Sequence, residues 1–280
     1  MELAILLSTY NSESFIKAQL ESLLSQTYKD WILYVRDDQS TDATPQILRQ
    51  YADNDSRIHV LPDGEKRGAR DGFMWLIQKI NSDFYMFCDH DDVWLPQKIE
   101  KSVSLMLKQP DWESTPIIVC TNTKLVDSEL LPISDSYWEY KCYRENMFAD
   151  KYYHLFYNNI LGCTMLFNRK TRNIAIPYPH DTAMHDSWIA VVTLWKKGRI
   201  IPIKEPLMLY RQHDGNTIGA PQMPSLFKQL NNFTNLWKKT SVQHHASRQL
   251  VKMPFPVFFL LKVWYMLLTH WRAFHKKNNL

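Results

Sequence analysis

The stretch FYMFCDHDDVW, residues 84–94, decides the fold of this chain. Five apolar residues stand between Asp83 and Asp89, which is the length and pattern of a buried strand. Three carboxylates follow where that strand ends, those of Asp89, Asp91 and Asp92. Alternate residues of an extended segment point the same way, so we expect Asp89 and Asp91 to share one face. The stretch therefore predicts a strand that brings paired carboxylates to one edge of a sheet.

Strands and helices alternate on both sides of this stretch, because short apolar runs are followed by segments with helical spacing. The expected strands are 2–9, 31–35, 58–61 and 84–88, and the expected helices begin near residues 12, 45, 71 and 96. Asn11 or Ser12 is the expected N-cap of the first helix, and Pro45 opens the second. This order predicts an α/β fold, a mostly parallel sheet with helices on its faces.

The C-terminal half is less regular. We expect strands over 117–126 and 160–167, a helix over 186–195, and short extended runs over 200–203 and 207–210. Between them lies a segment dense in aromatic residues, 137–157.

Polar residues gather at the ends of three predicted strands, over 8–11, 37–42 and 89–92. In such sheets ligands bind outside the carboxyl ends of the strands. Crowded carboxylates are unfavourable unless a cation or a donor-rich ligand lies among them. The sequence therefore predicts a ligand site at this edge.

Asp89 and Asp91, together with diphosphate oxygens, suit the octahedral shell of a hard divalent cation. The neutral imidazole of His213, after the last extended run, can finish that shell. The alternative for the acidic cluster is a helix N-cap at Asp92, which accounts for one carboxylate of three. For His213 the alternative is an ordinary polar side chain.

The other clusters have two interpretations each. A carboxylate in 37–42 can accept from the imide N–H of uracil or thymine, or the segment is a turn before a capped helix. Asp186 is either a helix N-cap or a general base that deprotonates a sugar hydroxyl. Arg211 can neutralise phosphate.

Three blocks together resemble family 2 of the inverting glycosyltransferases, which have the GT-A fold. They are STYN at 8–11, DDQSTD at 37–42 and CDHDDVW at 88–94, in this order. His185-Asp186 and Arg211-Gln212-His213 are similar to weaker blocks of the family. The resemblance implies a catalytic domain over 1–215, with a nucleotide-binding half, 1–110, and an acceptor-binding half, 111–215.

The resemblance also implies how the donor is held. Thr9 and Asp38 would hold the nucleotide base, with Tyr10 and Asn11 in the same block as Thr9. Asp89 would touch the ribose and the metal. The donor would be a UDP- or dTDP-sugar, and dTDP-rhamnose is the first candidate because the last block is similar to bacterial polysaccharide enzymes, including rhamnosyltransferases.

The metal and the base follow from the same resemblance. Asp91, with Asp92 beside it, and His213 would bind Mg²⁺ or Mn²⁺. Asp186 would take the proton of an acceptor hydroxyl as that hydroxyl displaces the nucleoside diphosphate and inverts the anomeric carbon. The acceptor would be a glycan, and a lipid-linked one fits an enzyme of the cytoplasmic face.

The chain departs from the family pattern at two places. His185 stands where the family usually has the first of two acids. The loop before the fourth strand carries Arg67 and Arg70 in place of an Asn-x-Gly motif, and these two cations are expected to contact phosphate.

The C-terminal tail, 216–280, is strongly basic. From residue 215 on the chain has nine Lys and Arg and no Asp or Glu, although the net charge of the whole chain is only +4. A helix over 257–276 would have an apolar side and a polar side. The apolar side comprises Val257, Leu260, Leu261, Val263, Trp264, Leu267, Leu268, Trp271 and Phe274. The polar side comprises Lys262, Thr269, Arg272 and Lys276, with Phe258, Phe259 and Met266 as exceptions.

Such a helix is typical of one that lies in a membrane interface, and nine cations suit anionic lipid. The alternative is a helix that packs its apolar stripe on the catalytic domain. Leu226, Phe227, Leu230, Phe233 and Trp237 repeat the spacing earlier in the tail. We expect a peripheral protein on the cytoplasmic face of the cell membrane, since the apolar N-terminus lacks the features of a signal peptide.

Composition and motifs limit the other classes. Hydrophobic residues are 45% and charged residues 22% of the chain, which is typical of a globular protein. Four cysteines without a CxxC pair favour buried thiols over a zinc site. A nucleotidyltransferase is the alternative enzyme, but the loop after the first strand has no Gly. A non-catalytic binder of an anionic partner is the other alternative, and we expect no nucleic acid because no binding module is recognisable.

Overall fold

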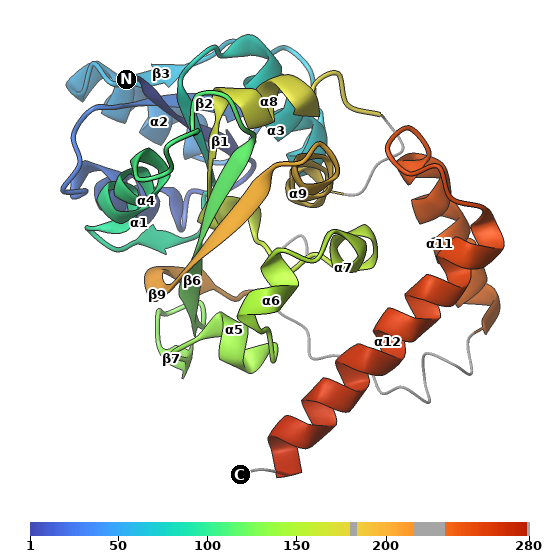
Figure 1. The fold of residues 1–280 in the computed structure, drawn as a ribbon. Helices are drawn as coiled ribbons and strands as arrows, with labels where there is room; N and C mark the ends of the chain where they lie inside the picture. Colours follow the sequence, from blue (N-terminus) through green and yellow to red (C-terminus); the bar gives the residue numbers. More distant parts are fainter. Residues whose placement is uncertain (180–183, 216–232, 279–280) are drawn as a thin grey trace.

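The computed structural model describes residues 1–179, 184–215 and 233–278. One sheet runs through the molecule, with helices on both of its faces and two long C-terminal helices at one side (Figure 1). The strands are β1 (Leu3–Thr9), β2 (Trp31–Asp37), β3 (Ile58–Val60), β4 (Phe84–Cys88), β5 (Val93–Trp94), β6 (Ile117–Val126), β7 (Pro132–Ser134), β8 (Met165–Asn168) and β9 (Arg199–Arg211). Their order is β3-β2-β1-β4-β8-β6-β9-β5, and β7 pairs with β6.

The helices connect and cover these strands. Those of the first half are α1 (Ile16–Leu24), α2 (Thr44–Asn54), α3 (Gly68–Lys79) and α4 (Lys98–Leu107). Those that follow are α5 (Tyr137–Tyr140), α6 (Glu145–Phe148), α7 (Lys151–Phe156), the 3₁₀ turn η1 (Gly162–Thr164), α8 (Arg169–Ala175) and α9 (His185–Trp195). The tail forms α11 (Phe233–Ser247) and α12 (Phe255–Asn278).

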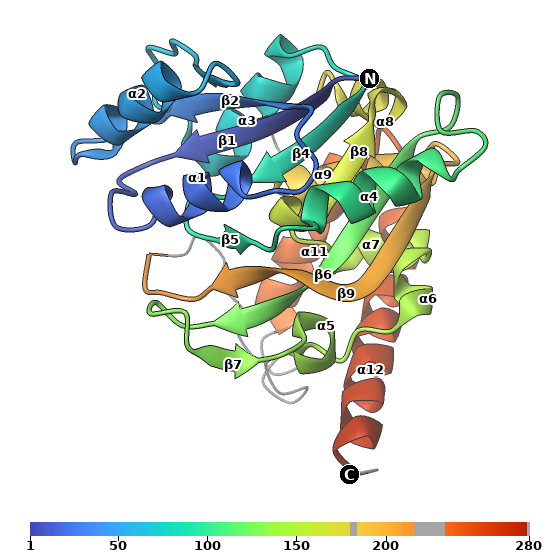
Figure 2. The ribbon, with the colours of Figure 1, turned by 90° about the vertical axis from the view of Figure 1, so that its left-hand side faces the viewer.

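The N-terminal half of the sheet is parallel, as the alternation of elements predicts. β1 pairs in parallel with β2 on one side and with β4 on the other. Side chains of β1 alternate between the two faces: Leu3, Ile5 and Leu7 pack with α1, α2 and α4, whereas Ala4 and Leu6 pack with α3 and α9. Figure 2 shows these strands side by side. Their carboxyl ends therefore point toward one edge.

Antiparallel pairs join the two halves of the sheet. β8 lies between β4 and β6 and is antiparallel to both. Only Met165–Asn168 of the expected strand 160–167 is extended, because Gly162–Thr164 forms a turn that enters it. The two short runs at 200–203 and 207–210 are parts of one strand, β9, which bends where its register with β6 shifts beside Asn122.

The prediction that Asn11 or Ser12 is the N-cap of α1 is wrong. The helix begins at Ile16 after Phe15, and no side chain caps it. Ser12 instead donates its backbone N–H to Thr44 Oγ1 at 2.8 Å, and its carbonyl accepts from the N–H groups of Phe15 and Ile16. These contacts tie the loop after β1 to the start of α2.

The tail helices pack on α7. α11 contacts α7 and α12, and α12 contacts α7. Phe258 of α12 meets Phe156 of α7 with ring centroids 4.9 Å apart. Tyr265 donates its hydroxyl to the Asp150 carboxylate, which also caps α7.

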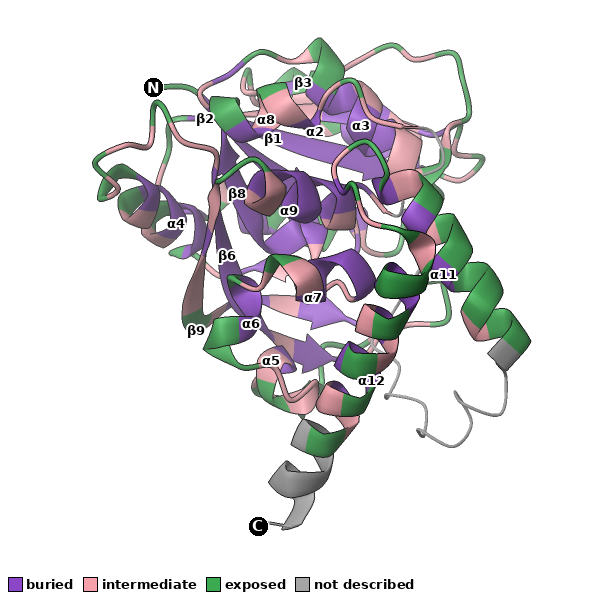
Figure 3. Cartoon of the chain, turned by 45° about the vertical axis from the view of Figure 1, so that its right-hand side comes forward, coloured by how far each residue is buried: buried purple, intermediate pink, exposed green. Residues whose placement is uncertain are grey.

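α12 does not dock on the protein through the centre of its apolar stripe. The residues that face the protein are Phe258, Phe259, Lys262, Tyr265, Met266 and Thr269, all buried. The exposed residues are Val257, Leu260, Trp264, Leu267 and Trp271 (Figure 3). The helix therefore docks through the side expected to be polar. Five residues of the apolar stripe stay exposed, whereas Leu261 and Leu268 of the stripe are partly buried against the neighbouring aromatic cluster. Leu226, Phe227 and Leu230 lie outside the described residues.

No helix in the described part of the chain is long and apolar enough to span a bilayer. The four cysteines are free, and three of them, Cys88, Cys120 and Cys163, are buried as expected.

Candidate active site

Hydrogen bonds join the first two polar blocks at the edge of the sheet. Thr9 donates its hydroxyl to Asp37 Oδ1 at 2.8 Å. Asn11, with φ of 44°, accepts from the Thr41 N–H through its side chain and donates its own N–H to Ser40 Oγ, each at 2.8 Å. Tyr10 stays exposed, with the Lys66 ammonium 4.0 Å above its ring. The predicted convergence of the two loops is thus present, and Tyr10 is the member that faces solvent.

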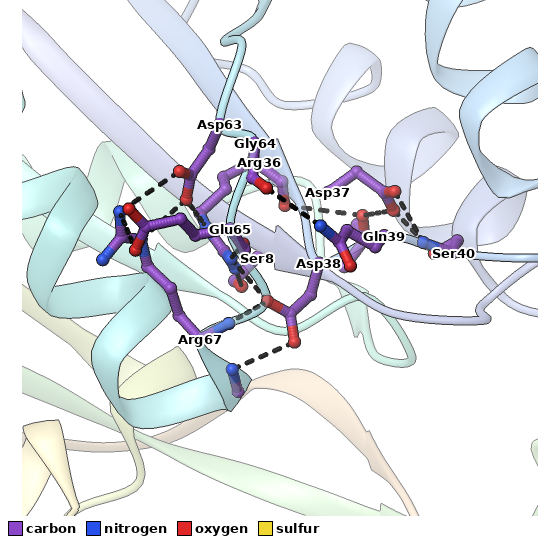
Figure 4. A network of polar contacts seen from close by, with 12 residues as sticks. Ser8, Arg36, Asp37, Asp38, Gln39, Ser40, Asp63, Gly64, Glu65 and Arg67 are labelled. Carbon is purple, nitrogen blue, oxygen red and sulfur yellow. Dashed lines mark hydrogen bonds and ion pairs between the residues drawn. The ribbon is translucent and has the colours of Figure 1, made fainter.

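Asp38 is buried in a network that reaches the start of α3 (Figure 4). Its carboxylate accepts from Arg36 Nη2, from the Arg67 N–H at 2.6 Å and from the Gly68 N–H at 3.0 Å. Although burial raises the pKa of Asp38, these hydrogen bonds outweigh it and hold the pKa below its usual value. Gly68 has φ of 72°, a conformation that glycine adopts readily. The carboxylate therefore fixes the loop that carries Arg67.

The three arginines expected at phosphate are held by protein groups. Arg67 pairs with Asp63 at 2.8 Å, and Arg70 pairs with Asp71 at 2.7 Å. Arg211 is buried: its backbone N–H donates to Asp92 Oδ1 at 3.1 Å, its Nε donates to the Asp91 carbonyl at 2.7 Å, and its Nη1 donates to the Ser128 carbonyl. Arg211 therefore supports the backbone of the acidic loop, and its contact with phosphate stays a prediction.

A pocket of about 200 Å³ opens at the same edge. Its lining includes carboxylates from two regions far apart in the sequence, Asp89 and Asp91 after β4 and Asp186 on α9. The remaining lining residues are Ser8, Ala69, Phe73, His90, Tyr137, Asn158, Leu161, Gly162, Met184, His185, Tyr210 and Gly215. The pocket thus draws on both expected halves of the catalytic domain, and it places the acidic loop and Asp186 around one cavity.

The expected metal ligands meet at this pocket. His213 Nε2 lies 2.9 Å from Asp91 Oδ2, and the Phe15 ring packs on the imidazole with centroids 4.5 Å apart. Enclosure in the pocket, and next the charge of Asp91, raise the pKa of Asp89 to about 7. Two carboxylates that repel each other beside an imidazole are a donor set that fits Mg²⁺ or Mn²⁺.

A second group of ligand atoms lies deeper. Among the described residues, Asp89, Asp92 and Cys163 each place one potential ligand atom within 4.8 Å of the others. Asp92 is fully buried, and burial raises its pKa well above the usual value. Its Oδ1 accepts from the Arg211 N–H, so we assign Asp92 to the support of the loop. A thiol is a soft ligand and does not suit Mg²⁺ or Mn²⁺.

Asp186 occupies the second position of α9, after Met184 at the N-cap. It therefore is not the N-cap, although its Oδ1 accepts from the Ser187 N–H at 2.6 Å. Burial raises the pKa of Asp186 to about 6, and hydrogen bonds from Ser187, Asn158 and Gly162 limit the rise. A buried carboxylate with this pKa is ionised at neutral pH and is a stronger base than an exposed one.

His185 is the lining residue whose role the sequence did not define. It is buried and packs against Phe73 and Phe87 with centroids 4.4 and 4.8 Å away. Neither ring nitrogen has a hydrogen-bond partner among the residues that the structure describes. Burial lowers its pKa to about 3, so the imidazole is neutral. A Cβ at Gly162 would lie 2.7 Å from His185 Nε2, so glycine is required there. Unpartnered buried polar atoms that line a pocket are suited to a ligand hydroxyl.

The amino-acid sequence matches the family model of glycosyl transferase family 2 over residues 4–189. The chain belongs to this family. The chain is also similar to bacterial glycosyltransferases: the dTDP-rhamnosyl transferase RfbG of Shigella flexneri is 27% identical over 264 residues, 86% of this chain and 83% of that protein. The glucosyltransferase WfgD of Escherichia coli is 36% identical over 105 residues, but the match covers only 38% of this chain and 41% of WfgD.

Solved structures show the same fold. TarS of S. aureus, in complex with UDP-GlcNAc, superposes with a TM-score of 0.63 at 16% identity and covers 96% of this chain and 72% of that one. The mannosyltransferase PcManGT from Pyrobaculum calidifontis, with GDP-Man and Mn²⁺, has a TM-score of 0.61 at 15% identity, covering 99% and 75%. The GT-A fold expected from the sequence is confirmed, and the family membership sets the nucleotidyltransferase alternative aside.

Proposed function

We propose that this glycosyltransferase moves a sugar from a UDP- or dTDP-sugar to a hydroxyl of a lipid-linked glycan, with inversion at the anomeric carbon. One observation carries the proposal: the paired carboxylates Asp89 and Asp91 and the basic carboxylate Asp186 line the same pocket from different elements. Such an arrangement suits a donor diphosphate at one end and an acceptor hydroxyl at the other.

Asp186 is the proposed general base. The acceptor oxygen forms a bond to the anomeric carbon while the bond from that carbon to the diphosphate breaks, and the hydroxyl proton passes to the Asp186 carboxylate. No covalent nucleophile is needed. Asn158 and Ser187 hydrogen-bond the carboxylate and hold its orientation.

Asp89, Asp91 and His213 are the proposed ligands of Mg²⁺ or Mn²⁺. When bound, the ion supplies positive charge that stabilises the leaving diphosphate. The protein contributes the geometry: Arg211 anchors the Asp91-Asp92 backbone, and Phe15 packs on the His213 ring.

Nucleotide contacts are proposed from the first two blocks. Ala69, between Arg67 and Arg70, lines the pocket, and Thr9, Asn11 and Asp38 hydrogen-bond the loops at the same edge of the sheet. Tyr10 is exposed in the first of these loops. The identity of RfbG as a dTDP-rhamnosyl transferase supports dTDP-rhamnose as the first donor to test.

The proposed acceptor is lipid-linked because the relative WfgD is a UDP-Glc:α-D-GlcNAc-diphosphoundecaprenol β-1,3-glucosyltransferase. The exposed apolar stripe of α12 and the basic tail support peripheral association with the inner face of the membrane.

The test is transfer from a panel of UDP- and dTDP-sugars in the presence of Mn²⁺, with the anomeric configuration of the product read by NMR. We expect one donor to react, the product to be inverted, and excess EDTA to abolish transfer. Asp91→Ala should abolish transfer while the melting temperature is kept, because it removes a carboxylate from a crowded acidic site. Asp135→Ala, an exposed acid outside the pocket, is the matched control. Full activity of Asp91→Ala or of the wild type in EDTA would refute the metal role.

A further inference from the structure

A second cavity, of about 190 Å³, lies between α11 and the acceptor half of the catalytic domain. This cavity, here called the helix groove, is lined by His154, Leu155 and Phe156 of α7, by Ser187, Trp188 and Val191 of α9, and by Val242, Gln243, Ala246 and Ser247 of α11. One water molecule occupies roughly 30 Å³ in the liquid, so the groove has room for more than a few waters. Figures 1 and 3 show α11 at the side of the molecule on which α7 lies, and the two helices are in contact.

The helix groove and the reaction pocket share one wall. Met184, His185 and Asp186 line the pocket, and the next two residues, Ser187 and Trp188, line the groove. The same holds after α7, where the chain leaves the groove at Phe156 and reaches the pocket at Asn158. A molecule with its reactive end at Asp186 would therefore have an apolar surface within one helical turn.

Most of the residues that line the groove are apolar. Val242 at its edge is 61% exposed, and the ring of Trp188 is fixed by a hydrogen bond of 2.9 Å from Nε1 to the Ala175 carbonyl. An exposed apolar wall costs free energy in water and is stabilised when an apolar group covers it.

The outer wall of the groove belongs to the unit that carries the apolar stripe. α11 packs on α12, where Trp237 meets Phe259 with centroids 4.9 Å apart and Lys262 donates to Gln243. Gln243 lines the groove, while Trp264 and Leu260 of α12 are 62% and 68% exposed. The groove and the exposed stripe therefore belong to one packed pair of helices, α11 and α12.

We propose that the helix groove binds the first part of the apolar chain of the lipid-linked acceptor, so that the diphosphate-linked sugar is presented to Asp186. This inference rests on the proposed function for the identity of the acceptor. The groove then selects acceptors by their lipid, and the reaction pocket selects them by their sugar.

The test uses Ala246→Trp, which fills the groove, and its neighbour His245→Trp, which is exposed outside it. A second pair, Val242→Asp and Ser241→Asp, places a charge at the groove or beside it without adding bulk. Binding of dansyl-labelled farnesyl diphosphate is measured by fluorescence in detergent-free buffer. We expect Ala246→Trp and Val242→Asp to raise its Kd at least about tenfold, the loss that corresponds to about two methylene groups leaving an apolar site. The two controls should bind as the wild type does.

Kinetics with two acceptors give the second readout. The same diphosphate-linked sugar is offered on a farnesyl chain or on a methyl group. Ala246→Trp should raise KM for the farnesyl acceptor toward that for the methyl acceptor and leave the methyl acceptor unchanged. Equal KM values of the wild type for both acceptors, or equal effects of Ala246→Trp and His245→Trp, would overturn the inference.

Two further outcomes separate this inference from the proposed function. If no acceptor is glycosylated but the farnesyl probe binds and Ala246→Trp prevents it, the groove stands and the function fails. If dihexanoyl phosphatidylcholine displaces the probe at equal concentration, the groove is a general site for acyl chains and the inference fails.

Discussion

Asp186 is buried, and it lines the reaction pocket. Its two possible roles are that of a general base and that of a hydrogen-bond acceptor in the first turn of α9, and replacing one carboxylate oxygen separates them. Asp186→Asn keeps the shape of the side chain and its ability to accept from the Ser187 N–H. It removes the proton acceptor, so turnover should fall at least about 100-fold, the low end of general-base catalysis. Donor affinity, measured by isothermal titration with the nucleotide sugar, should stay near normal. Turnover within a few-fold of the wild type would show that the carboxylate only stabilises the first turn of α9.

The raised pKa of the same group predicts the pH dependence. Burial raises the pKa of Asp186 to about 6, so kcat/KM at saturating Mn²⁺ should fall with unit slope below about pH 6. His185, the neighbour in the pocket, stays neutral over this range because burial lowers its pKa to about 3. An acidic limb centred near pH 4 would contradict the assignment.

The effect on stability has the opposite sign from that of a salt-bridged acid. The folded chain holds the Asp186 proton more tightly than the unfolded chain, whose pKa is near the usual value. The contribution of Asp186 to the free energy of unfolding is therefore favourable at low pH and is lost as the pH rises from about 4 to about 6. Asp186→Asn should remove this part of the pH dependence, as chemical denaturation at several pH values would show.

Single residues show where sequence reasoning stopped. The acidic block and Asp186 were found because their residue types are unusual beside buried strands and helices. The ion pair of Asp38 with Arg36 was not found, because Arg36 lies in β2, in a run with the pattern of an ordinary strand. The Arg36 side chain is fully buried. The partners of Arg211 come from residues about 80 and 120 positions away, which no local pattern contains.

At the scale of elements, most strands and helices followed from periodicity, and the exceptions have physical causes. The strand expected at 160–167 is shortened because Gly162–Thr164 forms a 3₁₀ turn, and Gly162 in this turn lies close to His185. In α12 both sides carry large apolar residues, so the helical wheel defined two sides but not which one docks. Tertiary contacts decide: Phe258 and Tyr265 meet the aromatic residues of α7, and the more regular stripe remains outside.

The outward stripe gives a prediction for this element. Leu260→Glu adds a negative charge to a residue that is 68% exposed, so the fold should tolerate it. Binding to anionic liposomes should weaken at least about tenfold in a sedimentation assay, since both apolar insertion and attraction to lipid are reduced. His245→Glu makes a similar change at an exposed position of α11 off the stripe and is the control. Equal binding of the two variants would show that the stripe does not meet the membrane.

At the scale of the whole molecule, the C-terminal tail has two sides. One side buries apolar residues of α7, and the other exposes apolar residues of α12 to solvent. Deletion of residues 220–280 would seem the simplest test of membrane binding, but it also uncovers Tyr153, Leu155 and Phe156 of α7, which are buried in the intact protein. It removes the Tyr265 hydroxyl from the carboxylate that caps α7 as well.

We therefore expect the deletion to lower the melting temperature by at least about 5 °C, since each large apolar side chain returned to water costs about 1.5–3 kcal/mol. Leu260→Glu should leave the melting temperature within about 1 °C of the wild type, because Leu260 touches solvent and not the core. Scanning calorimetry on the three proteins checks both statements. A deletion variant as stable as the full chain would show that α11 and α12 are a separate unit. In the structure the inner side of α12 stabilises the fold and only the outer side is available to lipid, so substitutions on the outer side, and not truncation, separate the two roles.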